Sequence, residues 1–313
     1  MARSIQKVAP TPLETLTEMN RALYQKRKKR RPARPSRKDE SVEVFYRGQL
    51  RSLVRLINQV IAAEVMPVVK QEKPAYTGDA LTMDGWAERV RAALQAAADQ
   101  FTTATFAAQA ERVAQDMVRR ADAVSTGAFV ESVNRAIGVD LSNMIDSERL
   151  QEELEAAVAE NISLIRSIPQ QHFTRLESIV LNGMRNGQTP TTIANNIREL
   201  SGVTYRRARF IARDQVAKLN GDITEARQSA AGITHYRAVD AGDERVTGRP
   251  GGRYPNAKIK CWEIARRDIG YGPGVYTWKE GASYAGQKGL HPGKHHPGCR
   301  CTATPVFEWE LPD

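Results

Sequence analysis

Cysteine and aromatic residues are scarce in this sequence of 313 residues. It contains three cysteines, and aromatic side chains make up only 6% of the chain. An odd and sparse set of cysteines argues against a disulfide framework and favours a reducing compartment such as a bacterial cytosol. So few aromatic residues suit helical bundles better than an aromatic-rich β-sandwich.

Two kinds of segment are also missing. The N-terminus lacks the apolar stretch of a signal peptide, and the most apolar run, near residues 60–69, is interrupted by Glu64 and Pro67. We therefore expect no membrane-spanning segment. No Walker-type phosphate loop and no G-x-S-x-G elbow occur. A Cys–His nucleophile pair stays open, since Cys261 could meet a histidine in space.

Positive charge is in excess, with a formal net charge of +10, which favours a polyanionic partner such as nucleic acid. Much of it lies in one short tract near the N-terminus, interrupted by Pro32 and Pro35, which predicts a disordered basic arm over residues 1–40. We expect this arm to contact double-stranded DNA non-specifically through phosphates, with a solubilising tail as the alternative. The candidate DNA-binding residues are Lys26, Arg27, Lys28, Lys29, Arg30, Arg31, Arg34, Arg37 and Lys38.

A helical domain is predicted over residues 41–160. Leu50, Leu53 and Ile57 recur at the three- and four-residue spacing of an amphipathic helix. Residues 86–120 are rich in alanine, glutamine, glutamate and arginine, which are good helix formers. We interpret the apolar stripes as packing faces of a bundle and assign no chemistry to them.

More helices are expected over residues 168–231. Pro169 favours a helix start there, and Gly202 favours a break between two further helices at 190–200 and 204–230. This pair superficially has the outline of a DNA-reading helix-turn-helix, although helical hairpins of this kind are common packing units.

The pattern changes after residue 232. Strands are predicted at 233–239, 275–278 and 299–307, one short helix at 259–267, and loop over the Gly-, Lys- and His-rich residues 281–298. The predicted fold class is therefore mainly α, with a helical N-terminal body and a small C-terminal α+β module that ends at residue 307.

The densest group of chemically active side chains lies in that module. Three histidines and two cysteines fall within residues 291–301. Zinc prefers about four nitrogen or sulfur ligands in a tetrahedral shell, and residues two apart in a strand share a side. A structural zinc ion is thus the candidate cofactor, with exposed loop histidines beside buried thiols as the alternative. The candidate ligands are Cys261, His291, His296, Cys299 and Cys301.

A second polar group, Asp240, Asp243, Glu244 and Arg245, follows a predicted strand. Paired carboxylates can bind a divalent ion or act as acid and base. Such a turn more often makes ion pairs and satisfies loop backbone groups. We therefore assign no catalytic residue.

Several segments resemble the phage Mu F-like head-morphogenesis proteins, in the order of that family. They are NISLIRSIP at 161–169, the helix at 173–187, TYRRARFIARDQVA at 204–217, DERV at 243–246, GVYTW at 274–278 and HPGCRCTATPVF at 296–307. The resemblance implies a family domain over residues 161–313, and leaves open whether His291 or His296 matches the family histidine. Its family-motif residues are Asp243, Arg245, Trp278 and Arg300.

The resemblance implies a non-enzymatic minor head protein that acts in procapsid assembly and maturation and in DNA packaging or ejection. The implied partners are the portal protein, the scaffold and the major capsid protein. The implied location is the virion, at the capsid interior or portal vertex, and the host cytoplasm during assembly. The alternative function is a metal-dependent, nuclease-like DNA-processing enzyme that uses the His/Cys loop.

Overall fold

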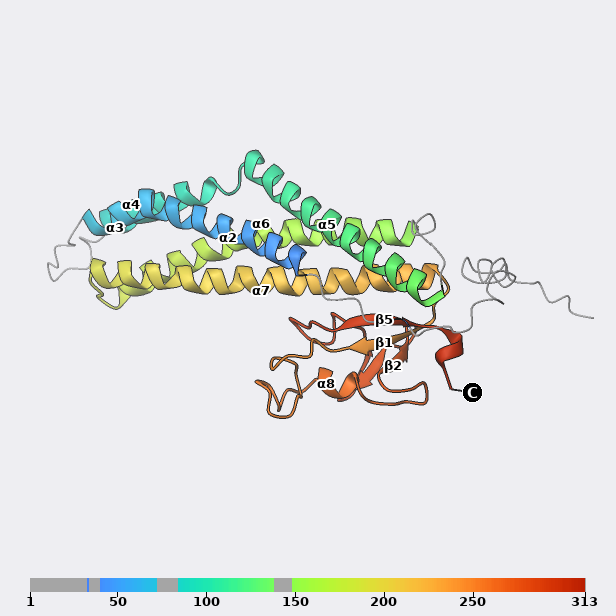
Figure 1. The fold of residues 1–313 in the computed structure, drawn as a ribbon. Coiled ribbons are helices and arrows are strands. Elements are labelled where there is room, and N and C mark those ends of the chain that lie inside the picture. The colour runs from blue at the N-terminus through green and yellow to red at the C-terminus, as the bar shows by residue number, and fades with distance from the viewer. Residues whose placement is uncertain (1–32, 34–39, 72–83, 138–147, 313) are drawn as a thin grey trace, which may run out of the picture. The chain divides into compact units, whose positions relative to one another are not determined.

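Helices dominate a computed structural model of the chain, which describes residues 33, 40–71, 84–137 and 148–312 (Figure 1). The elements are α2 (Ser41–Val60), the π-helical η1 (Ile61–Val65), α3 (Met66–Gln71), α4 (Asp84–Asp99), α5 (Ala104–Ile137), α6 (Glu148–Arg185), α7 (Pro190–Ala230), β1 (His235–Val239), α8 (Cys261–Ile264), β2 (Val275–Thr277), β3 (Ala282–Tyr284), β4 (Gln287–Leu290), β5 (Thr302–Val306) and η4 (Glu308–Glu310). The predicted fold class is confirmed. The candidate DNA-binding residues of the basic arm lie outside the described residues.

The described chain forms two compact units. The helical unit comprises Ser41–Met117 and Ala157–Gln215, and the C-terminal unit comprises Val118–Ala156 and Val216–Asp313. Helices α5, α6 and α7 each contribute residues to both units. The domain boundary predicted at residue 160 falls within α6.

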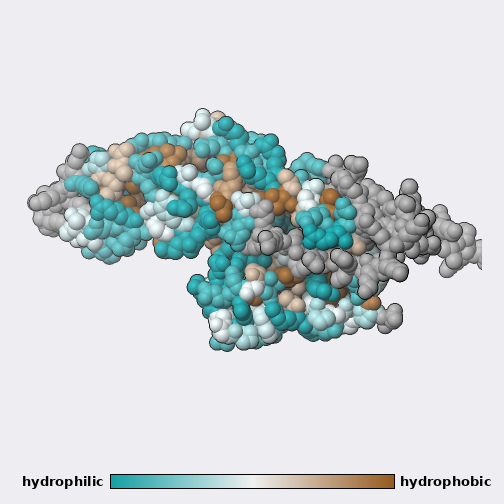
Figure 2. All heavy atoms as spheres, viewed as in Figure 1, coloured by the Kyte–Doolittle hydropathy of each residue, from teal (hydrophilic) through white to brown (hydrophobic). Residues whose placement is uncertain are grey.

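The helical unit has its core on one stripe of α2. The buried residues of this helix are Val42, Tyr46, Leu50, Val54 and Ile57, which recur every three or four positions. On the face drawn in Figure 2, brown hydrophobic residues lie among teal hydrophilic ones over the helices of the helical unit. The buried hydroxyl of Tyr46 donates a hydrogen bond to Oδ1 of Asn161 on α6, at 2.8 Å.

By length and composition alone, Ser41–Lys70 also qualifies as a candidate membrane span, with 28% of its most apolar window buried. A core helix passes the same test, and the hydrogen bond between Tyr46 and Asn161 joins this stretch to α6. The absence of a membrane-spanning segment therefore stays a prediction.

The helix start predicted at Pro169 is wrong, because this proline lies inside α6. Proline removes one backbone donor and costs roughly 3 kcal/mol in a helix interior. The neighbouring Ile165, Ile168 and Phe173 are buried. Their packing on both sides of the proline offsets the local preference for a helix end, since burying each such side chain stabilises by about 1.5–3 kcal/mol.

The break predicted at Gly202 is also wrong, because α7 runs without interruption from Pro190 to Ala230. The hydroxyl of Thr204 donates within the helix to the carbonyl oxygen of Leu200, at 3.2 Å, and does not cap a new helix. Since the turn does not exist, the helix-turn-helix interpretation is wrong as well.

The C-terminal unit contains an antiparallel sheet in the order β2-β1-β5, with Tyr236 opposite Tyr276 on one side and Pro305 on the other. The ring centroids of Tyr236 and Trp278 lie 4.1 Å apart, and the indole N–H of Trp278 donates to Gln228 of α7 at 3.0 Å. These contacts form a small aromatic core against the end of α7.

Two details of the predicted module differ from the structure. Residues 281–298 contain the hairpin of β3 and β4 where loop was predicted. Three residues of β4 are exposed, so no alternating pattern marks the strand. The short helix expected at 259–267 is confined to Cys261–Ile264.

A candidate metal centre in the C-terminal unit

Three cysteines and one histidine meet in the C-terminal unit. The ligand atoms of Cys261, His295, Cys299 and Cys301 all lie within 4.8 Å of one another, and the four residues are buried. The Sγ of Cys261 is 3.4 Å from Nδ1 of His295 and 3.9 Å from Sγ of Cys299. The separations of 3.4 and 3.9 Å are close to the edges of a tetrahedron around zinc, roughly 3.5–3.8 Å for bonds of about 2.0–2.3 Å. The cysteines are free thiols, since a disulfide needs about 2.05 Å between sulfurs.

The structure brings together the three cysteines expected as ligands, but the histidine beside them is His295, not His291 or His296. The ring of His291 stacks on Trp278, with centroids 5.8 Å apart and planes at 4°. Its Nδ1 lies 3.8 Å from the carboxylate of Glu225. His291 therefore faces α7 and the aromatic core.

His296 also points elsewhere. Its Nδ1 lies 2.9 Å from the carbonyl oxygen of Pro297, and its Nε2 lies 3.4 Å from the hydroxyl of Thr247. His296 therefore lies near the cluster, beside Thr247, but is not one of the four candidate ligands.

The loop before His295 packs closely against α7, and this packing explains why His295 is the histidine that lies beside the cysteines. Gly293 has φ of +83°, and a Cβ there would lie 2.3 Å from the carbonyl oxygen of Ala217. A Cβ at Gly221 would lie 2.4 Å from the carbonyl oxygen of Pro292. Only glycine permits so close an approach of two backbones.

The next residues complete this seating. Lys294 forms an ion pair with Asp222 of α7. His295, which follows, is only 2% exposed and faces the cysteines. Gly221 and Gly293 permit this close contact, but the sequence alone does not show that the two glycines lie where the loop meets α7.

Cys261 is positioned by the segment that precedes α8. The backbone N–H of Cys261 donates to the hydroxyl of Thr247 at 3.1 Å, and that of Trp262 donates to the carbonyl oxygen of Thr247 at 3.0 Å. Gly248, with φ of +76°, lies so close to Lys260 that an added Cβ would be 2.4 Å from the lysine Cβ. Thr247 and Gly248 thus close the loop over the first residue of α8.

Cys299 and Cys301 are positioned by a turn directly before β5. The N–H of Cys299 donates to the carbonyl oxygen of His296 at 3.0 Å, and Cys301 immediately precedes Thr302, the first residue of β5. The three cysteines form a buried apolar cluster with Val246. Their sulfur atoms are therefore screened from water.

The thiols perturb one another strongly. Hydrogen bonds from Cys261 and Cys301 hold the pKa of Cys299 well below its usual value. The same contact with Cys299 raises the pKa of Cys261 to about 12, and hydrogen bonding to Cys261 and Cys299 raises the pKa of Cys301. Three buried thiolates together need a cation to offset their charge.

Three family-motif residues meet next to this cluster. Arg300, which stands between Cys299 and Cys301, donates to both carboxylate oxygens of Asp243, with Nη1 to Oδ2 at 2.6 Å. The backbone and guanidinium of Arg245 also donate to Asp243, each at 2.9 Å. These bonds, those from Arg300 first, hold the pKa of the Asp243 carboxyl well below its ordinary range. The fourth motif residue, Trp278, lies in the aromatic core.

The other carboxylates of the acidic turn make ion pairs as well. Asp240 pairs with Arg266, and Glu244 pairs with Arg253 at 2.9 Å. This is the arrangement of a turn held by ion pairs rather than of a pair of catalytic carboxylates.

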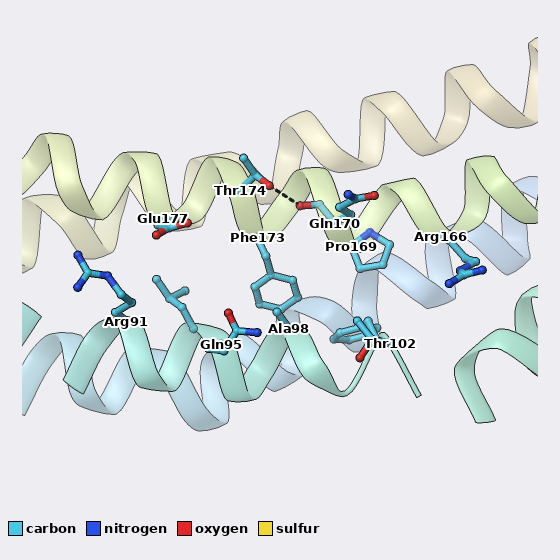
Figure 3. Close-up of a pocket in the computed structure, with 12 residues that line it drawn as sticks. Arg91, Gln95, Ala98, Thr102, Arg166, Pro169, Gln170, Phe173, Thr174 and Glu177 are labelled. Carbon is cyan, nitrogen blue, oxygen red and sulfur yellow. Dashed lines mark hydrogen bonds between the residues drawn. The ribbon is translucent and has the colours of Figure 1, made fainter. Parts of the chain in front are cut away.

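A separate groove of about 420 Å³ lies between α4 and α6 in the helical unit. In Figure 3, Phe173 points from α6 toward α4, and Arg91 and Glu177 come from the two facing helices. Its lining residues include neither cysteine nor histidine. The groove therefore offers no counterpart to the ligand set of the C-terminal unit.

The C-terminal unit thus contains short strands packed on the end of α7, together with a cysteine–histidine cluster. Residues 174–304 match the family described as phage Mu protein F like protein. The resemblance inferred from the sequence is confirmed over this segment, which contains the cluster and all four family-motif residues. The match is a similarity of this segment, and it is consistent with a phage Mu F-like head-morphogenesis protein.

A protein of Haemophilus influenzae (strain ATCC 51907 / DSM 11121 / KW20 / Rd), described as an uncharacterized protein, is 29% identical over 232 residues. The matched region is 74% of this chain and 51% of that protein, so the chain spans about half the length of this relative. No solved structure matches the chain.

Proposed function

We propose that this chain is a minor head protein that associates with the portal and the inner side of the capsid during phage head assembly. The observation that carries the proposal is the match of residues 174–304 to the phage Mu protein F like family. In the proposal, the protein is a virion component, with the scaffold and the major capsid protein as further partners.

The contacts of the C-terminal unit support a structural role without catalysis. Asp243 is engaged by Arg300 and Arg245, and Asp240 by Arg266. Groups of the kind that perform acid–base chemistry are thus committed to holding loops in place. A catalytic metal keeps a coordination position open for water, whereas the four candidate ligands here are all protein side chains.

DNA contact through the basic arm is the second part of the proposal, with a role in DNA packaging or ejection. The tract at 26–38 contains nine lysines and arginines in thirteen residues. Each phosphate neutralised by such a side chain releases counterions, so that affinity falls steeply with salt. Binding of this kind reads no base sequence, which suits a protein that meets packaged DNA.

Portal association is tested by expressing the chain together with the portal and capsid proteins of its own phage. We expect a tagged chain to retain the portal protein through purification, and to be found in purified particles by mass spectrometry. A chain that retains no portal protein, or that is absent from particles, would contradict the proposal.

DNA contact is tested by fluorescence anisotropy with a duplex over a series of salt concentrations. Replacing the nine basic residues of the arm by glutamine should weaken binding and flatten its salt dependence, since each lost phosphate contact changes the slope by about 0.9. An arm with the same residues in scrambled order is the matched control and should bind as the natural arm does. If the glutamine variant bound the duplex as tightly as the natural chain, the proposed DNA contact through the arm would be contradicted.

A further inference from the structure

We propose that Cys261, His295, Cys299 and Cys301 bind one Zn²⁺ ion in a closed tetrahedral site that ties together the loops of the C-terminal unit. This inference does not depend on the proposed function, because it rests on the ligand geometry alone.

The kind of ligand selects the kind of metal. Three thiolates and one imidazole nitrogen form a soft donor set, which Zn²⁺ prefers, and the cluster contains no carboxylate of the kind that Mg²⁺ and Ca²⁺ require. The 3.4 Å between Cys261 and His295 and the 3.9 Å between Cys261 and Cys299 allow one ion to reach all these atoms.

Burial makes the cluster unfavourable without a cation. His295 is 2% exposed, and its Nδ1 lies against the sulfur of Cys261. A metal bound at Nδ1 supplies that nitrogen with a strong ligand bond and offsets the charge of the thiolates.

The origin of the ligands shows what the ion would hold. Cys261 begins α8 at the end of the long connection from β1, whereas His295 and Cys299 lie in the connection from β4 to β5. These residues are 34 and 38 positions from Cys261. One ion would therefore join two long irregular segments to the start of β5, next to the pair of Arg300 and Asp243.

The site is structural rather than catalytic, because four protein side chains complete a tetrahedral shell and leave no position for water or substrate. The proposed site also gives the two neighbouring histidines different roles. His295 is a ligand, whereas His296 lies beside the shell near Thr247.

The first test is the zinc content of the purified full-length chain, produced with zinc in the growth medium. We expect one zinc ion per chain, and loss of most of it in Cys299→Ser and His295→Gln. His296→Gln is the matched control and should retain zinc, since it changes the adjacent histidine outside the shell. His295→Cys should also retain zinc, because it replaces one ligand by another.

A second measurement uses the unmutated chain, so that it does not depend on the folding of variants. After removal of the metal with a chelator and addition of Co²⁺, we expect the intense visible absorption of a tetrahedral site with thiolate ligands. A weak octahedral spectrum would overturn the proposal. So would iron in place of zinc, or cysteines that react with iodoacetamide equally fast with and without Zn²⁺.

Discussion

The helical unit is stabilised internally by one kind of interaction, and the C-terminal unit by another. In the helical unit, stripes of fully buried side chains such as Tyr46, Leu50 and Ile57 spread the stabilisation over many similar contacts. In the C-terminal unit, strands of three to five residues surround a small core, and long loops depend on a few specific groups. We therefore expect single changes to have their largest effects in the C-terminal unit.

The largest effect is expected for Gly293→Ala, which would break the seating of the ligand loop on α7. The new Cβ would lie 2.3 Å from a backbone oxygen at a φ of +83°. We expect a loss of about 4 kcal/mol or more in the free energy of unfolding of the C-terminal unit. Chemical unfolding followed by tryptophan fluorescence would measure it.

Gly251→Ala is the matched control for this change. Gly251 also has a positive φ, of +69°, but nothing lies within 4 Å of an added Cβ. We expect only the cost of backbone strain, about 1–2 kcal/mol. If the two variants were equally stable, close packing of the loop would not be what positions His295.

The next effect concerns the core of the helical unit. Leu50→Ala should destabilise that unit by about 3 kcal/mol, because it removes a fully buried side chain and leaves a cavity. Leu56→Ala on the same helix is the control, since Leu56 is 41% exposed. Urea unfolding monitored by circular dichroism would measure both, and a cost for Leu56→Ala equal to that of Leu50→Ala would refute the assigned face.

These packing faces show what the sequence could predict. The mainly helical body was predicted correctly because a spacing of three and four residues is a local signal of one buried face. The boundaries at Pro169 and Gly202 were wrong because packing on both sides carried α6 and α7 through local helix breakers. Tertiary contacts of this kind leave no local signature.

The candidate metal centre could be predicted only in part, because one of its four residues is positioned by tertiary contacts. The three cysteines were named from their residue type and from the spacing of Cys299 and Cys301. The histidine was missed, because its selection depends on where Gly293 and Lys294 meet α7. The role of the basic arm stays a prediction, since its residues lie outside the described ones.

A pH dependence should appear in the helical unit. His172 is buried beside Thr204, with 2.7 Å between Nδ1 and the hydroxyl oxygen, and burial, aided by Arg175, lowers its pKa from 6.5 to about 4. The unfolded chain therefore binds the proton more readily, so stability is lost as the pH falls from 6.5 toward 4. The pKa difference corresponds to roughly 3 kcal/mol as an upper limit.

Urea unfolding between pH 7 and pH 4 would measure this effect. The variant His172→Gln lacks the titrating group, so its stability should fall less over the same range. A wild-type chain whose helical unit is equally stable at both ends of this range would contradict the assignment.

The smallest effect is expected for Arg300→Lys. Lysine keeps the charge but cannot donate two parallel hydrogen bonds to Asp243, so we expect a loss of about 1–2 kcal/mol in the C-terminal unit. Arg253→Lys, at the exposed pair with Glu244, should change stability by less than about 0.5 kcal/mol. Thermal unfolding would compare the two variants, and equal melting temperatures would show that the partly buried pair of Arg300 and Asp243 stabilises no more than the exposed pair.

The central claim is that a metal holds the C-terminal unit while packing holds the helical unit. Hydrogen exchange of the full-length chain, before and after chelation of zinc, tests it most directly. We predict that backbone amides of 235–306 lose protection after chelation, whereas those of 41–71 and 157–215 keep it. Equal protection of 235–306 with and without zinc would contradict the claim.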